Sequence, residues 1–214
     1  YNNRFKPELN KNYLELYHGP TCAFKDAALL FLPQIMKRAK KSLGVNEEIV
    51  ILTATSGDTG KAALEGFSSV DGFKVVVYYP KNGVSAIQER QMATQEGENV
   101  KVFGINGNFD NAQTGVKKIF GDEKLKEELK KNGYILSSAN SINIGRLVPQ
   151  IVYYFYGYFK LIEQGKIKED EEINVVVPTG NFGNILASYY GKQMGLPINK
   201  FICASNENKV LTDF

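Results

Sequence analysis

The sequence predicts an α/β fold in which parallel β-sheets are covered by helices. Short apolar runs, such as residues 49–52, 73–79 and 173–177, alternate along the chain with longer segments of helical period. Several of these runs also end in junctions rich in glycine, hydroxyl and amide residues before the next helix begins. Strands that alternate with helices favour a parallel sheet covered on both faces, and such junctions gather at the carboxyl edge of the strands, where ligands bind.

The chain begins with a predicted strand at residues 13–17, where apolar and acidic side chains alternate. Gly19 and Pro20 break this run. A helix is then predicted over residues 27–36, followed by a basic cluster and by Gly44 as its end. Residues 49–52 are short and apolar enough for a buried parallel strand.

The same order of strand, loop and helix repeats through the rest of the chain. Strands are predicted at residues 73–79, 100–103, 134–136, 173–177 and 201–204, and helices at residues 85–96, 110–120, 147–162 and 185–194. Residues 121–132 carry Glu and Lys at helical spacing and residues 164–172 are polar, so we expect both segments at the surface.

Composition argues against nucleic-acid and membrane partners. The chain has 214 residues, of which 43% are hydrophobic and 23% charged, as is ordinary for a globular protein. The net charge of +3 comes from 26 basic and 23 acidic residues mixed along the chain, without the basic stripe of a nucleic-acid binder. The apolar run at residues 147–162 is interrupted by polar residues and is shorter than the roughly 20 residues that span a bilayer. With two cysteines and no charged-then-apolar leader, the chain is expected in the reducing cytoplasm.

No metal site is expected, because His18 is the single histidine of the chain. Its position beside Gly19 and Pro20 indicates a hydrogen-bonded turn residue rather than a catalytic base. Cys22 is expected to be packed rather than reactive.

Lys25 is the candidate nucleophile. It stands just before the first predicted helix, among the apolar residues Ala23, Phe24 and Ala27. Apolar surroundings and the positive end of a helix dipole both push a lysine towards the neutral amine, which is nucleophilic. The alternative is that Lys25 pairs with Asp26 or with solvent.

Three strand-to-helix junctions are suited to hold anions. They cover residues 53–60, 137–146 and 178–184 and consist mainly of small hydroxyl, amide and glycine residues. Glycines let backbone N–H groups converge, and a helix N-terminus adds positive potential. Ordinary helix capping would explain any one junction, but three of them together with Lys25 indicate several anionic groups in one cleft.

Common nucleotide motifs do not fit these junctions. A Walker A loop needs Ser or Thr after Gly-Lys and an upstream glycine, whereas Gly60-Lys61 is followed by Ala62 and the upstream position holds Thr55. The dinucleotide motif is incomplete too, since residues 57–60 and 180–183 contain only its later pair of glycines. A reactive lysine with a glycine-rich phosphate nest fits pyridoxal phosphate, which forms an imine with a lysine.

Four blocks of the sequence resemble the threonine synthase family, which shares the pyridoxal-phosphate fold (fold type II) of tryptophan synthase β and the cysteine synthases. The blocks are residues 14–21 (LELYHGPT) leading to Phe24-Lys25-Asp26, residues 53–60 (TATSGDTG), residues 138–146 (SANSINIGR) and residues 178–184 (PTGNFGN). The resemblance implies a tryptophan-synthase-β-like architecture. In it, residues 1–48 and 146–214 belong to a large cofactor-binding domain, and residues 49–145 form a smaller α/β domain.

The resemblance also implies a reaction, the conversion of O-phospho-L-homoserine and water into L-threonine and phosphate by γ-elimination and β-addition of water. Lys25, which matches the family lysine, would hold pyridoxal phosphate as an imine and then shuttle protons at Cα and Cβ, with the pyridine ring as electron sink. By the same match, the loop that holds the cofactor phosphate comprises Gly180, Asn181, Phe182, Gly183 and Asn184. The loop that meets the substrate and flanks the cofactor ring comprises Ser56, Gly57, Asp58 and Thr59. The substrate-phosphate site comprises Asn140, Ser141, Asn143 and Arg146.

Two of these positions have a physical reading of their own. The Arg146 guanidinium matches a phosphate and stands at a helix start beside amide and hydroxyl donors. A surface position for Arg146 is the alternative, which its apolar neighbours Leu147 and Val148 weaken. Asp58 departs from the wider fold, where many members carry Asn against the cofactor ring, and a carboxylate there would need a protonated partner.

Other functions remain open alongside this one. A related lyase or dehydratase would act on an amino acid without the γ-phosphate, and a non-catalytic phosphometabolite-binding fragment would use the anion loops without Lys25. The chain starts on Tyr1, stops soon after the strand at residues 201–204 and is shorter than members of the family, so we expect a fragment that is a poor catalyst by itself. The family also places a C-terminal hydroxyl against the pyridine nitrogen, and no later junction supplies it here. The oligomeric state stays open.

Overall fold

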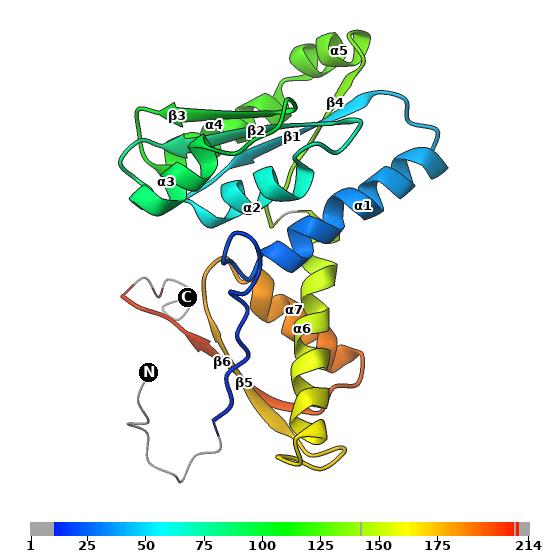
Figure 1. The fold of residues 1–214 in the computed structure, drawn as a ribbon, viewed down its shortest axis with the longest axis vertical. Coiled ribbons are helices and arrows are strands. Elements are labelled where there is room, and N and C mark those ends of the chain that lie inside the picture. Colours follow the sequence, from blue (N-terminus) through cyan, green and yellow to red (C-terminus); the bar gives the residue numbers. More distant parts are fainter. Residues whose placement is uncertain (1–10, 142, 208, 210–214) are drawn as a thin grey trace.

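The computed structural model describes residues 11–141, 143–207 and 209, in which helices and strands alternate as predicted (Figure 1). The strands are β1 (Glu48–Ala54), β2 (Phe73–Pro80), β3 (Val100–Ile105), β4 (Tyr134–Ser137), β5 (Ile173–Pro178) and β6 (Ile198–Ala204). The helices are α1 (Asp26–Ser42), α2 (Asp58–Phe67), α3 (Ala86–Ala93), α4 (Phe109–Gly121), α5 (Glu123–Lys131), α6 (Ile144–Glu163) and α7 (Gly183–Gln193). Every helix and strand predicted after residue 20 is present, with ends that shift by a few residues.

The strand predicted at residues 13–17 is wrong. Residues 11–18 have no regular secondary structure, and Tyr13 is 75% exposed. The segment contacts α6 and the turn after it through side chains instead: Leu14 approaches Gly157 of α6, and Lys166 Nζ, beyond the end of α6, donates to Asn12 Oδ1 at 2.7 Å. Alternation alone does not make a strand, because a strand also needs a neighbour that accepts its backbone hydrogen bonds.

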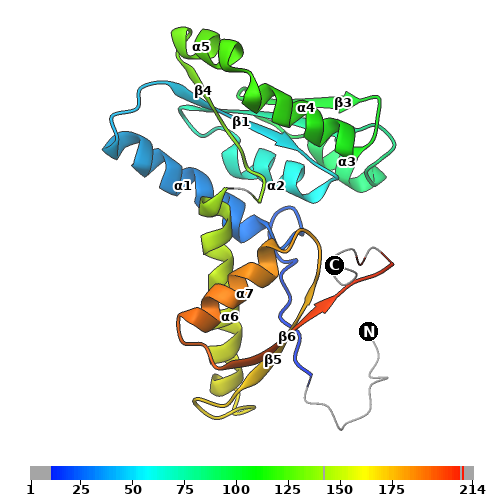
Figure 2. The same ribbon diagram turned by 180° about the vertical axis from the view of Figure 1, so that it is seen from behind.

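Four strands form a parallel sheet in the order β3-β2-β1-β4. One face packs against α1, α2 and α3, where Ile51 and Val75 meet Leu29, Phe67 and Met92 in one core. The other face packs against α4 through a second core, composed of Leu52, Ala54, Ala112 and Val116 (Figure 2). Alternate residues of β1 thus serve opposite faces, as expected for a strand buried on both sides.

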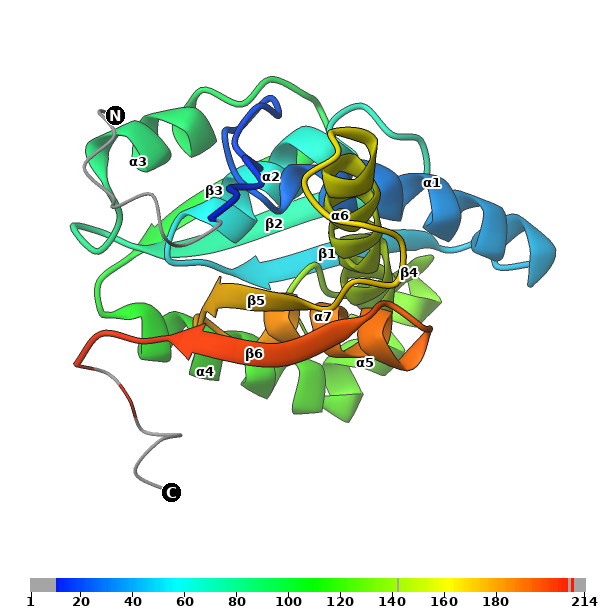
Figure 3. The same ribbon diagram turned by 90° about the horizontal axis from the view of Figure 1, so that it is seen from below.

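The second sheet, of parallel strands β5 and β6, is covered on one face only by the described residues. Tyr158 of α6 packs with Leu196, Ile198 and Val175 beneath α6 and α7. On the other face Val176 is 62% exposed and Ile202 47% exposed. Figure 3 shows β5 and β6 lying side by side. The expectation of cover on both faces therefore holds for the four-stranded sheet and not for this one.

Helix α1 lies against both α2 and α6 and so joins the two sheets. In the sequence, the strands of the first sheet all precede residue 145 and those of the second all follow it. The division into a large and a small domain stays a prediction. Within the described part of the chain, no helix has the length and apolar character needed to cross a membrane.

Replacing Gly66 should destabilise the contact between α1 and α2. A Cβ on Gly66 would lie 2.2 Å from the carbonyl oxygen of Leu29, which is backbone and cannot swing aside. We expect Gly66→Ala to lower the free energy of unfolding by about 1–3 kcal/mol. The matched control is Gly115→Ala in α4, where a Cβ meets nothing within 4 Å and the substitution should stabilise by about 0.5–1 kcal/mol. Urea unfolding measures both, and equal effects would contradict the close approach at Gly66.

Candidate active site

Lys25 lies at the start of α1, as predicted, and its ammonium pairs with Asp58 rather than with its neighbour Asp26. Its side chain is 14% exposed, with Nζ 4.1 Å from the centre of the Phe24 ring and 3.4 Å from Asp58 Oδ2 on the first turn of α2. Asp26 is buried and accepts hydrogen bonds from the Thr21 hydroxyl and from the Thr21 backbone N–H at 2.9 Å. Asp26 therefore holds the loop before Lys25, and the alternative pairing of these two neighbours is wrong.

The surroundings of Lys25 lower the pKa of its amine. Burial is the largest cause that lowers its pKa, and the nearby cations Arg146 and Lys61 lower it further, against the raising effect of Asp58. Burial raises the pKa of Asp58, but Lys25, Gln88 and Lys61 together outweigh this and lower it, so Asp58 is a carboxylate. Asp58 thus has two lysine amines as neighbours, Lys25 Nζ at 3.4 Å and Lys61 Nζ at 3.3 Å, and its contact with the cofactor ring stays a prediction.

Two residues that contact Asp58 were not predicted from the sequence. Lys61 is buried, donates to the Thr21 carbonyl oxygen at 2.7 Å and lies 3.3 Å from Asp58 Oδ1. Gln88 of α3 donates from Nε2 to the same Asp58 oxygen at 2.9 Å. The available signal was the spacing of Asp58 and Lys61, three residues apart on one helix face. Gln88 belongs to a capping box with Ser85 at the start of α3, but no local pattern indicates its bond to Asp58.

The junction at residues 138–146 is braced by its own amide side chains. Asn140 Nδ2 donates to the carbonyl oxygen of Ala54 at 3.1 Å and so joins the loop to the end of β1. Asn143 caps α6 by accepting from the Gly145 N–H at 2.9 Å and donates to the Ser138 carbonyl oxygen at 2.8 Å. Helix capping, the alternative considered for each junction, is present at this one.

Arg146 is 6% exposed, so a surface position for it is wrong. Nη1 donates to the Ala139 carbonyl oxygen at 3.0 Å, while the buried Nε has no hydrogen-bond partner among the described residues. Burial disfavours the charged form and lowers the pKa of Arg146 to about 10, which still leaves a cation at neutral pH. A buried donor is expected to find an acceptor, and an anion provides one.

The glycine-rich junction before α7 is open to an anion. Gly180 and Phe182 both have left-handed backbone angles, with φ of +46° and +60°, and no side chain caps the helix. The first N–H groups of a helix have no partner within it, and they attract negative charge. Tyr154 of α6, which the sequence reasoning missed, donates to Asn184, with its hydroxyl 2.8 Å from the backbone oxygen and 2.7 Å from Oδ1. Burial raises the pKa of Tyr154, so this hydroxyl stays a donor.

Helix α6 brings these parts together. The Tyr153 hydroxyl donates to the carbonyl oxygen of Phe24, next to Lys25, while the adjacent Tyr154 holds Asn184 at the start of α7. A Cβ on Gly183 would lie 3.8 Å from Ser141 Cβ, so the two amide-rich junctions also lie side by side. Figures 1 and 2 show α6 running beside α7 and meeting α1. The structure thus gathers Lys25, Asp58 and all three junctions; Ser56, Gly57 and Thr59 lie with Asp58 where α2 begins.

Two smaller expectations have opposite outcomes. His18 Nε2 donates a hydrogen bond to Glu15 Oε2 at 2.9 Å, as expected of a hydrogen-bonded turn residue. Cys22 is exposed rather than packed, and its backbone takes a left-handed conformation with φ of +56°. In the described part of the chain, no group of three or more His, Cys, Asp and Glu residues could hold a metal ion.

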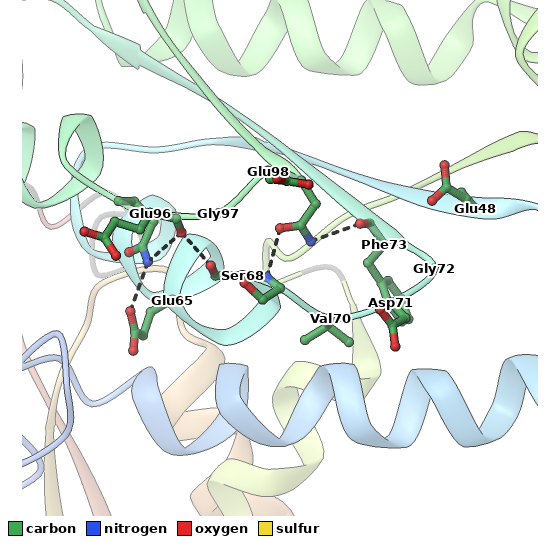
Figure 4. A pocket seen from close by; sticks show the side chains of 13 residues that line it. Glu48, Glu65, Ser68, Val70, Asp71, Gly72, Phe73, Glu96, Gly97 and Glu98 are labelled. Carbon is green, nitrogen blue, oxygen red and sulfur yellow. Dashed lines mark hydrogen bonds between the residues drawn. The ribbon is translucent and has the colours of Figure 1, made fainter.

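A cavity of about 990 Å³ lies at the other end of the four-stranded sheet, where β1 to β3 begin (Figure 4). Five carboxylates line it, those of Glu48, Glu65, Asp71, Glu96 and Glu98. Such a lining repels phosphate, so the cavity does not compete with the Lys25 site for the anionic ligands considered above.

Comparison with known proteins agrees with the resemblance seen in the sequence. Residues 7–213 match the model of the family described as pyridoxal-phosphate dependent enzyme. The chain is 49% identical over 211 residues to threonine synthase-like 1 of Pongo abelii and 44% identical over 213 residues to threonine synthase of Eremothecium gossypii. These matches cover 96% of this chain but only 28% and 40% of the two relatives. Among solved structures, the PLP-bound threonine synthase of Brucella melitensis superposes with a TM-score of 0.80 at 42% identity, over 93% of this chain and 40% of that one.

Proposed function

Since this chain belongs to the family of pyridoxal-phosphate-dependent enzymes, we propose that it carries the cofactor and substrate site of a threonine synthase, a lyase of amino-acid biosynthesis. The reaction is the conversion of O-phospho-L-homoserine and water into L-threonine and phosphate. One observation carries the proposal: a lysine that is 14% exposed and has a lowered pKa lies beside a carboxylate and is tied through α6 to an uncapped, glycine-rich helix start.

The residues present fit pyridoxal phosphate. The start of α7 offers N–H groups without a side-chain cap, which suits a phosphate, and the Lys25 amine is kept poorly solvated, which suits covalent attachment. We propose that the cofactor phosphate binds the backbone of a loop composed of Gly180, Asn181, Phe182, Gly183 and Asn184. Pyridoxal phosphate, when bound, supplies the electron sink for carbanion chemistry on an amino acid.

The proton work falls to Lys25. In the loaded enzyme the Lys25 amine would take the protons from Cα and Cβ of the substrate and would return protons to Cγ and Cα, while water would supply the Cβ hydroxyl and a proton for the released phosphate. Asp58 lies 3.4 Å from Lys25 Nζ and holds this amine in place while it takes and returns protons. Ser56, Gly57 and Thr59, at the start of α2, are proposed to hold the substrate beside the cofactor.

Recognition of the substrate phosphate is proposed for Asn140, Ser141, Asn143 and Arg146. Support comes from Arg146, whose cation is buried and whose Nε lacks a partner among the described residues. The bracing bonds of Asn140 and Asn143 favour a second candidate, a related lyase or dehydratase on an amino acid without the γ-phosphate. In that enzyme these amides only shape the loop. A protein that only binds phosphate would not explain why Lys25 is only 14% exposed beside Asp58.

A turnover assay separates these functions. The full-length protein, loaded with pyridoxal phosphate, is expected to release phosphate from O-phospho-L-homoserine and to form threonine in equal amount. A control with Lys25→Ala should give neither product. Ammonia and a keto acid from serine or threonine, without phosphate release, would establish the second candidate instead.

The two free cysteines support a reducing compartment such as the cytoplasm for this activity.

A further inference from the structure

Lys61 is the buried charge that the proposed chemistry leaves unassigned. It lies on α2, one turn after Asp58, and its side chain is 8% exposed. Its ammonium makes two contacts, a hydrogen bond of 2.7 Å to the Thr21 carbonyl oxygen and an ion pair of 3.3 Å with Asp58 Oδ1. Burial of an ammonium costs free energy, so the position of Lys61 beside a reactive lysine calls for a functional explanation.

The two oxygens of Asp58 are used differently. Oδ1 receives Lys61 at 3.3 Å and Gln88 Nε2 at 2.9 Å, whereas Oδ2 lies 3.4 Å from Lys25. Lys61 also holds the Thr21 carbonyl, in the same loop that Asp26 closes in front of Lys25. One ammonium therefore joins the loop that carries Lys25 to the carboxylate that Lys25 faces.

We propose that Lys61 is a positioning residue: its charge holds Asp58 through Oδ1, so that Oδ2 stays directed at Lys25, and it fixes the Lys25 loop through Thr21. The inference rests on the proposed function only in taking Lys25 as the reactive amine. The same cation also offsets part of the Asp58 charge, so without it the carboxylate, still held by Gln88, would favour the protonated form of Lys25 more strongly.

The charged and titratable groups around Lys25 define what a measurement reports. Asp58 and Lys61 face it from α2, Arg146 and Tyr153 belong to α6, and Asp26 on its own helix is engaged by the loop. Glu65, one turn after Lys61, lines a cavity of about 330 Å³ together with Lys61 and Thr21. Among these groups, Lys61 is the cation that touches both Asp58 and the loop.

The test is the pH dependence of Lys25 acetylation in the full-length apoprotein, measured with a trace of acetic anhydride and peptide mass spectrometry. In Lys61→Met the midpoint for Lys25 is expected to rise by about one pKa unit, which lowers its labelling below that midpoint about tenfold. Lys61→Arg, which keeps the charge, is expected to restore most of the labelling. Lys61→Gln keeps a donor for Thr21 without the charge and is expected to behave like Lys61→Met; it also replaces that variant should it fail to fold.

The matched control is Lys74→Met, which removes an ion-paired lysine 3.2 Å from Glu48 at the other end of the sheet. It should leave Lys25 labelling unchanged. Restoration by Lys61→Gln, or a Lys25 curve that does not move in any Lys61 variant, would overturn the proposal and leave Lys61 as a structural residue. Labelling needs neither cofactor nor substrate, so this result is independent of whether the protein turns over phosphohomoserine.

Discussion

Borohydride reduction of the protein in the presence of pyridoxal phosphate is expected to leave the cofactor covalently attached to Lys25 Nζ. The reason is the setting of this amine, which is 14% exposed, has a lowered pKa and lies beside Asp58. Peptide mapping after reduction identifies the modified lysine. Lys25→Ala should abolish the attachment and reduce turnover by roughly 10²–10⁴-fold or more, the range typical for loss of a positioned acid or base.

Lys74→Ala is the control for that experiment, because Lys74 is ion-paired with Glu48 but 43% exposed and distant from the junctions. It should keep both the attachment and the turnover. A modified peptide centred on another lysine, with Lys25 unmodified, would refute the assignment.

Most of the secondary structure was predictable because its signals are local. Short apolar runs and segments of helical period indicated β1 to β6 and six of the seven helices of the described residues, whereas α2 was expected only as the helix that follows the junction at residues 53–60. The order β3-β2-β1-β4 was not predictable in the same way, since strand pairing joins segments far apart in the chain. The wrong strand at residues 13–17 has the same origin: its pattern is local, whereas the missing partner strand is not.

The residues of the candidate site also divide into those with a local sequence signal and those without one. Lys25 and the three junctions were found because each is a short motif at the start of a helix. Lys61, Gln88 and Tyr154 were missed because their roles arise only from contacts across the fold. The hydrogen bond from Tyr153 to Phe24 is another contact of this kind, because it joins residues 129 positions apart in the sequence. Arg146 lies between these cases, since its motif was visible in the sequence and its burial was not.

Arg146→Ala is expected to weaken recognition of O-phospho-L-homoserine much more than it weakens binding of pyridoxal phosphate. A lost charge-assisted hydrogen bond costs about 1.5–3 kcal/mol, which is roughly tenfold or more in affinity. The cofactor phosphate is proposed to bind α7 instead, so its affinity should change little. KM for the substrate and the dissociation constant of the cofactor, both measured on the full-length protein, give the two values.

Burial makes a control essential for this prediction, because Arg146 also donates to the Ala139 carbonyl oxygen and its removal disturbs the start of α6. Gln150→Leu serves for this purpose. Gln150 lies one turn further along the same helix, is 3% exposed and donates to the Arg146 backbone oxygen at 3.0 Å, but carries no charge. If Arg146 binds the substrate phosphate, Arg146→Ala raises KM at least tenfold more than Gln150→Leu does, while both variants retain the cofactor. Equal losses of substrate and cofactor in Arg146→Ala would instead show that the guanidinium is structural and that the phosphate is recognised elsewhere.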